Sequence, residues 1–124
     1  MAMIFGFSSL STLPTPPGGF SFYDVHIAAY AGLGALTARA TLRQAQGRPE
    51  RSRGATGKGL RDVSWRAVLG AIAIASLYGL SDEYHQLFVP GRTFDVLDIV
   101  ADVVGSVVGA SAVGAWSRIT KLAD

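Results

Sequence analysis

Three long apolar stretches alternate with polar segments along the chain. They cover about Asp24–Leu42, Trp65–Tyr84 and Phe94–Trp116. Within them, the runs Ala71–Leu80 and Val103–Ala110 are apolar all round a helix, with no polar face. A soluble three-helix bundle, the alternative, would leave a large apolar surface in water. The pattern therefore predicts an all-α fold, an integral-membrane helical bundle with three full transmembrane helices.

A shorter apolar segment precedes these stretches. Ile4–Leu10 is followed by a proline-rich exit, Leu13–Gly19. It lacks the basic leading region and the small-residue cleavage site of a signal peptide. We interpret it as the end of a truncated N-terminal helix, or as a sign that the true start lies upstream. At 124 residues the chain allows a single membrane domain, 1–124.

The composition agrees with a membrane protein and excludes several kinds of reactive or metal-binding site. Charged residues make up 16% of the chain, against about 25% in soluble domains. The absence of cysteine excludes disulfides, thiol nucleophiles and zinc–thiolate sites.

The polar, arginine-rich stretch Arg39–Arg66 has no apolar periodicity, which predicts a disordered loop at about residues 42–60. A lipid- or nucleic-acid-binding patch is the alternative for that loop, but basic cytoplasmic loops are common for topological reasons, so we predict no nucleic-acid partner.

The basic residues are distributed unevenly. Of 11, eight lie in Arg39–Arg66, and Arg118 and Lys121 follow the last apolar stretch. If three helices cross the bilayer, Arg92 is the only basic residue on the side opposite these ten. Six of the nine acidic residues lie at or near that opposite side. The positive-inside rule then predicts a multi-pass protein in the lipid bilayer, with the basic loop and the C-terminus cytoplasmic.

Polar residues gather at the predicted external face. His26 and Tyr30 are four residues apart, so they share one side of a helix. Each ionisable group inside a membrane helix costs roughly 2.5–3.5 kcal/mol, so a shared, water-accessible pocket is the economical arrangement. Gly105 and Gly109 continue the polar side of the last helix with the spacing that permits close backbone approach. The candidate pocket residues are His26, Tyr30, Asp82, Glu83, His85, Gln86, Arg92, Asp98 and Asp102.

These residues also carry a resemblance to a known family. The segment Asp82–Thr93 reads Asp-Glu-Tyr-His-Gln-Leu-Phe-Val-Pro-Gly-Arg-Thr and is followed by Asp98. With His26–Gly34, a His-x-x-x-Tyr-x-x-Leu-Gly element, it resembles the signature of the VanZ-like integral membrane proteins. Ile4–Leu10 is similar to the end of that family's first helix. The family usually has Asp-Lys where this chain has Phe22-Tyr23, and commonly Asn at the position of Asp102.

The resemblance implies a role at the bacterial cell envelope, since the family's founding members are linked to resistance to glycopeptides such as teicoplanin. Three hypotheses follow. The pocket binds a polar head group, for example of a lipid-linked cell-wall intermediate, or a glycopeptide, with Arg92 taking a phosphate. Alternatively, the cluster makes a membrane enzyme, either metal-assisted or metal-free, or it only locks the helices together. In the enzyme hypothesis the residues that offer metal ligands or acid–base partners are His26, His85, Glu83, Asp98 and Asp102. No HExxH or similar ligand spacing and no Ser or Cys nucleophile motif is present, so we predict neither metal nor cofactor.

Overall fold

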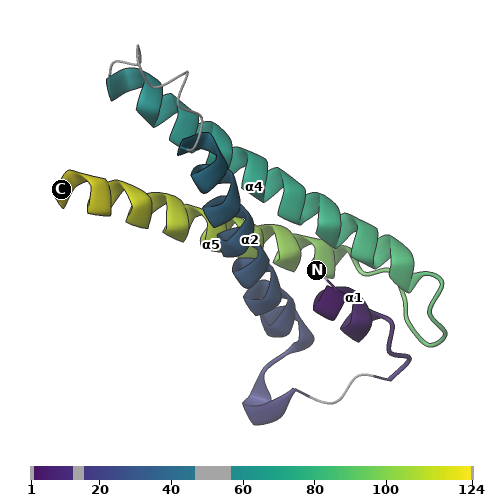
Figure 1. The fold of residues 1–124 in the computed structure, drawn as a ribbon. Helices are drawn as coiled ribbons and strands as arrows, with labels where there is room; N and C mark the ends of the chain where they lie inside the picture. Colours follow the sequence, from purple (N-terminus) through teal and green to yellow (C-terminus); the bar gives the residue numbers. More distant parts are fainter. Residues whose placement is uncertain (1, 13–15, 47–56, 124) are drawn as a thin grey trace.

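The computed structural model describes residues 2–12, 16–46 and 57–123. Within these ranges the protein has four α-helices and no strand, which confirms the predicted all-α fold (Figure 1). The elements are α1 (Ala2–Ser8), a 3-10 turn (Pro17–Gly19), α2 (Phe22–Gln46), α4 (Gly57–Gln86) and α5 (Val96–Ala123).

One of the described helices, α5, contains a segment long and apolar enough to cross a membrane, Val96–Thr120. The helices α2 and α4 have 25 and 30 residues, hence lengths of about 37 and 45 Å, which exceed the ~30 Å apolar core of a bilayer. The uncharged run of each helix is shorter than the helix itself. In α2 it ends before Arg39 and Arg43, and in α4 it ends before Asp82 and Glu83. A membrane-spanning α5 is therefore supported by composition, whereas spans through α2 and α4 stay a prediction.

The distribution of side chains is the reverse of that in a water-soluble bundle. Large aliphatic side chains of α4 face outward, among them Leu69, Leu77 and Leu80. Several acidic and amide side chains are buried instead, including Glu83 at 0% exposure and Asp102 at 1%. Because burying a charge is costly and exposing apolar surface to water is unfavourable, this arrangement fits an apolar solvent around the helices.

The tightest helix contact joins α2 to α5 through small residues. A Cβ atom added at Gly34 would lie 2.5 Å from the carbonyl oxygen of Ser106. One added at Gly105 or Gly109 would collide with the backbone of α2 at Ile27 or Ala31. The glycine spacing on α5 was predicted to allow close backbone approach, and the structure confirms it.

The predicted disordered loop at about residues 42–60 needs correction at both ends. The helix α2 continues to Gln46 and α4 already begins at Gly57. Leu42 is buried, and the Thr41 hydroxyl donates a hydrogen bond to the Ala67 carbonyl at 3.2 Å, so contacts with α4 hold this part of α2 in the bundle. The centre of the predicted loop, 47–56, lies outside the described residues.

Candidate functional site

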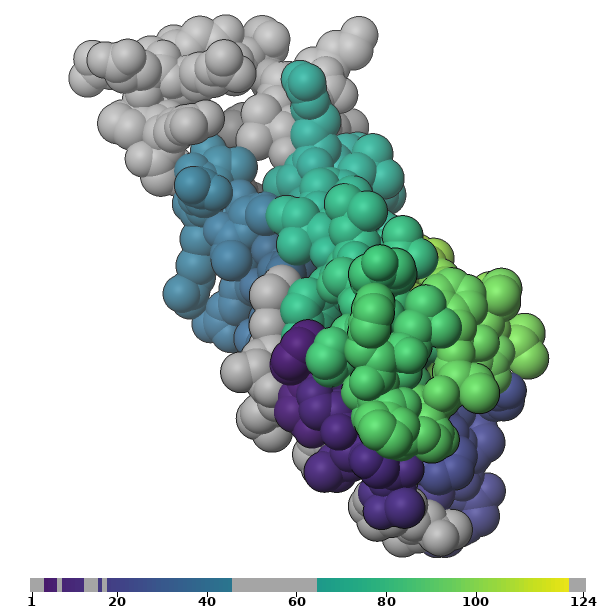
Figure 2. Space-filling model, turned by 90° about the vertical axis from the view of Figure 1, so that its right-hand side faces the viewer, coloured from purple at the N-terminus to yellow at the C-terminus, as the bar shows by residue number. Residues whose placement is uncertain are grey.

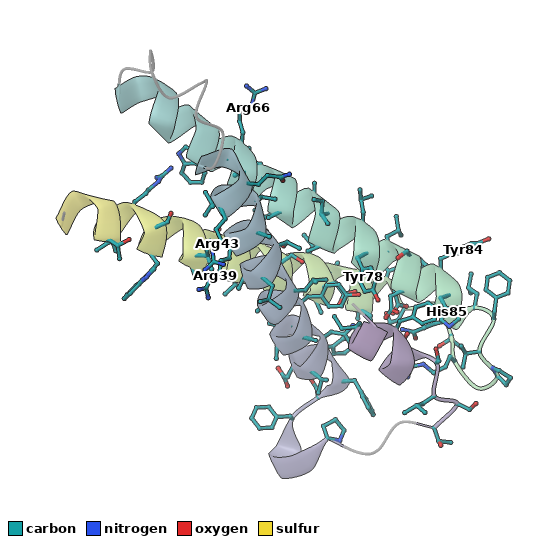
Figure 3. All side chains as sticks on the ribbon, in the orientation of Figure 1. Arg39, Arg43, Arg66, Tyr78, Tyr84 and His85 are labelled. Atoms are coloured by element: carbon teal, nitrogen blue, oxygen red, sulfur yellow. The ribbon has the colours of Figure 1, made fainter. Side chains whose placement is uncertain are left out.

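The start of α2, the end of α4 and the start of α5 meet at one end of the bundle, where α1 also packs. In Figure 2 the purple α1 lies directly against the green end of α4. Figure 3 shows His85 and Tyr84 at this end, while Arg66 lies toward the other end of α4. Among the side chains that the structure describes, the buried acidic ones thus lie at this end of the bundle, and Arg66 lies toward the other.

A tight turn joins α4 to α5 and fixes the distance between their ends. The backbone N–H of Val89 donates to the Gln86 carbonyl at 3.1 Å, and that of Arg92 donates to the Val89 carbonyl at 3.1 Å. Gly91 has a φ of 81°, a left-handed conformation that side chains disfavour. The Val-Pro-Gly-Arg sequence therefore folds as the turn that was predicted, and it brings Arg92 back toward α4.

The first part of the site links α2 to α5. His26 Nδ1 lies 2.8 Å from Asp102 Oδ1, and its Nε2 lies 3.7 Å from Asp98 Oδ2. An ionised carboxylate can only accept, so Nδ1–H is the donor to an ionised Asp102. A neutral His26 ring then has its lone pair on Nε2, which faces Asp98. A Cβ at Gly79 would lie 2.6 Å from Asp102 Oδ2, which makes glycine necessary on α4 beside this carboxylate.

The second part is a chain of hydrogen bonds from the turn to α4 and back to α5. Arg92 donates from Nε at 3.0 Å and from Nη2 at 2.6 Å to Gln86 Oε1. Gln86 Nε2 donates at 2.6 Å to Glu83 Oε1, and the Asp95 backbone N–H donates at 3.0 Å to Glu83 Oε2. Both oxygens of Glu83 are thereby held in place by an amide and a backbone N–H.

The third part involves α1, whose polar residues the sequence analysis missed. The Ser8 hydroxyl donates at 2.6 Å to Asp82 Oδ1, and Ser9 Oγ lies 3.2 Å from His85 Nε2. The Phe5 ring stacks on His85 with centroids 4.2 Å apart. Asp82 and His85 belong to the predicted pocket residues, and these contacts join them to α1. No motif around these serines could have indicated their role.

Tyr23 lies at the rim of the site, before the apolar part of α2. Its hydroxyl donates at 3.2 Å to Asp95 Oδ2, and this hydrogen bond to a carboxylate raises the pKa of Tyr23. Tyr23 occupies the position where the VanZ-like pattern has lysine. The phenol therefore supplies one donor to Asp95, just before α5, without the positive charge of a lysine.

Several buried polar atoms in this region have no hydrogen-bond partner among the described residues. They are Tyr30 Oη, Asp82 Oδ2, Asp98 Oδ1 and Asp102 Oδ2. Tyr30 is 1% exposed, and its ring lies nearly parallel to that of His26 with centroids 6.3 Å apart. Unpartnered buried oxygens are rare in proteins and mark places where water, an ion or a ligand completes the site.

One subset has the geometry to hold a metal ion. His26, Glu83 and Asp98 each offer a ligand atom, and these three atoms lie within 4.8 Å of one another. They come from α2, α4 and α5, so no sequence spacing relates them. The sequence analysis included these three residues among the possible ligands of a membrane enzyme, but it predicted no metal because no standard ligand spacing is present. Only the packing of the helices brings these three, out of the five candidates, together.

Comparison with known proteins gives one match. A family model described as VanZ/LLP1 matches residues 24–117, which covers both segments that carried the resemblance. No curated protein and no solved structure matches the chain.

Proposed function

The chain belongs to the VanZ/LLP1 family, and we propose that it is a multi-pass protein of the bacterial cell membrane whose polar end binds the phosphate-bearing head group of an envelope lipid. In this proposal α2, α4 and α5 all cross the bilayer, with the basic end cytoplasmic and the polar cluster external. The lipid is of the class of lipid-linked cell-wall intermediates. The relation to teicoplanin resistance belongs to the same proposal.

The main observation behind this proposal is the inverted arrangement of side chains, with carboxylates buried at one end of a bundle that has an apolar surface. Buried polar groups that only lock helices together should satisfy one another, but four oxygens here lack a partner among the described residues. That difference favours binding over a purely structural cluster.

Arg92 is the residue suited to a phosphate. It is half-buried at the rim, and it gives two of its five N–H donors to Gln86. The remaining donors can form charge-assisted hydrogen bonds with phosphate oxygens. Glu83, Asp98 and Asp102 would repel a phosphate placed deeper, so the head group contacts the arginine at the rim rather than the carboxylates directly.

The test is binding of a polyprenyl phosphate to purified protein in detergent micelles, measured by native mass spectrometry. The matched ligand control is the polyprenol of the same chain length. Arg92→Gln should weaken phosphate binding about 10- to 150-fold, because a hydrogen bond to a charged group is worth about 1.5–3 kcal/mol. Arg66→Gln, at the other end of α4, should leave binding unchanged (Figure 3).

Equal binding of the phosphate and the alcohol would refute the proposal, as would an Arg92→Gln variant that binds like the wild type. Recovery of folded protein separates binding from a structural role. If the cluster only locks helices, Arg92→Gln should reduce the amount of monodisperse protein in proportion to binding. Catalysis, the other alternative, would convert the bound polyprenyl phosphate to a product of different mass in the same spectra.

A further inference from the structure

The group His26, Glu83 and Asp98 has a feature that the proposed head-group contact at Arg92 does not use. The three side chains come from three helices, yet their ligand atoms lie within 4.8 Å. Glu83 is fully buried, and Asp98 is 9% exposed. Two carboxylates this close repel each other when both are ionised, and a cation between them or a proton on one of them relieves that repulsion.

The orientation of His26 provides an independent observation. His26 Nδ1 lies 2.8 Å from Asp102 Oδ1, so in the neutral ring that carries its proton on Nδ1 the Nε2 lone pair is free. Nε2 faces Asp98 Oδ2 at 3.7 Å, beyond hydrogen-bond distance. A carboxylate that fixes one ring nitrogen while the other bears a free lone pair is the arrangement that supports metal-bound histidines.

The two carboxylates differ in how they are held. Glu83 accepts from the Gln86 side chain at 2.6 Å and from the Asp95 backbone at 3.0 Å, so its oxygens are oriented before any ion arrives. Asp98 Oδ1 is buried and has no hydrogen-bond partner within the described part of the chain. The other oxygen of this carboxylate, Oδ2, is the one that lies 3.7 Å from His26 Nε2, so Asp98 offers a cation an unpartnered buried oxygen and a second oxygen beside the imidazole.

We propose that His26, Glu83 and Asp98 bind one divalent transition-metal ion, of the zinc or manganese class, with Asp102 as a positioning residue for His26. One nitrogen and two oxygen ligands suit these ions, whereas calcium and magnesium prefer all-oxygen sites. Metal–ligand bonds of about 2.1 Å around a tetrahedral ion bring the ligand atoms to about 3.4 Å apart. The side chains must therefore draw together by roughly 1 Å, which rotation about their own bonds can supply.

Three protein ligands leave at least one coordination position open. An ion there would neutralise the local charge, because its two positive charges would offset those of Glu83 and Asp98 close to Arg92. A phosphate oxygen could then occupy the open position, and only this last step rests on the proposed head-group function. The metal-site proposal itself does not depend on the head-group function.

The experiment measures metal binding by purified, chelator-treated protein in micelles, without any lipid. Zinc and manganese are titrated by isothermal calorimetry with magnesium as the control ion, and bound metal is counted by plasma mass spectrometry after dialysis. Wild type and Asp24→Asn, an exposed carboxylate at the same end, should bind one zinc ion per chain. Glu83→Gln and Asp98→Asn should lose stoichiometric binding, and Asp102→Asn should weaken it about 10- to 100-fold.

A wild-type protein that retains no zinc or manganese above the micelle blank would overturn the proposal, as would full binding by Asp98→Asn. Variants that fail to fold do not obscure the answer, because cobalt added to the wild type gives visible absorption that reports nitrogen and oxygen ligation. A cobalt spectrum identical to that of the aqueous ion counts against the site. Failure of polyprenyl phosphate binding with intact zinc binding would refute only the head-group proposal.

Discussion

Replacing Gly109 with alanine should weaken the α2–α5 contact and destabilise the bundle. The added Cβ would collide with the Ala31 carbonyl oxygen and lie 2.7 Å from the Ala31 carbonyl carbon. Carbon atoms in contact are normally 3.5–4.0 Å apart, so the α2 backbone must move by about 1 Å. Such overpacking costs about 1–3 kcal/mol, and alanine's better helix propensity returns up to about 1 kcal/mol. The collision is with backbone atoms, which cannot rotate aside as a side chain can, so the upper part of that range, about 2–3 kcal/mol, applies. The expected net loss in the free energy of unfolding is therefore about 1–2 kcal/mol.

Gly32→Ala is the matched control in the same helix pair. No atom lies within 4 Å of a Cβ at Gly32, so helix propensity alone should act and stabilise the protein by about 0.5–1 kcal/mol. Unfolding by SDS in mixed micelles, followed by circular dichroism, gives both changes in one assay. The two identical substitutions should thus shift stability in opposite directions. A Gly109→Ala protein as stable as Gly32→Ala would show that α2 and α5 do not approach as described.

Two further predictions test α1 and the topology. Ser8→Ala should lower the free energy of unfolding by about 1–3 kcal/mol, because buried Asp82 loses its hydrogen bond. The control Ser9→Ala, at an exposed position, should change the free energy of unfolding by less than about 0.5 kcal/mol. Equal effects of the two substitutions in SDS unfolding would argue against the Ser8 contact. The chain has no native cysteine, so a cysteine at Thr93 should react with an impermeant maleimide in intact cells and one at Arg43 only after permeabilisation. Labelling in the reverse order would contradict the proposed orientation.

The polar end of the protein could be predicted only in part. The histidine-to-tyrosine spacing and the Val-Pro-Gly-Arg turn follow from local rules, since helical periodicity and turn preferences depend on neighbouring residues. The contact of His26 with Asp102 joins residues 76 positions apart, and periodicity carries no information about such pairs. The contact of His85 with α1 could not be predicted from the sequence either, because it depends on Phe5 and Ser9 folding back onto α4.

The sequence by itself determined the helical fold, the separation of charge between the two ends and the glycine face of α5. These features arise from periodicity and composition, which act along a single chain segment. Only the tertiary structure decided which helices touch and which oxygens find partners. It brought His26, Glu83 and Asp98 together from three helices, because the small residues between α2 and α5 let the two backbones approach until side chains distant in sequence share one site.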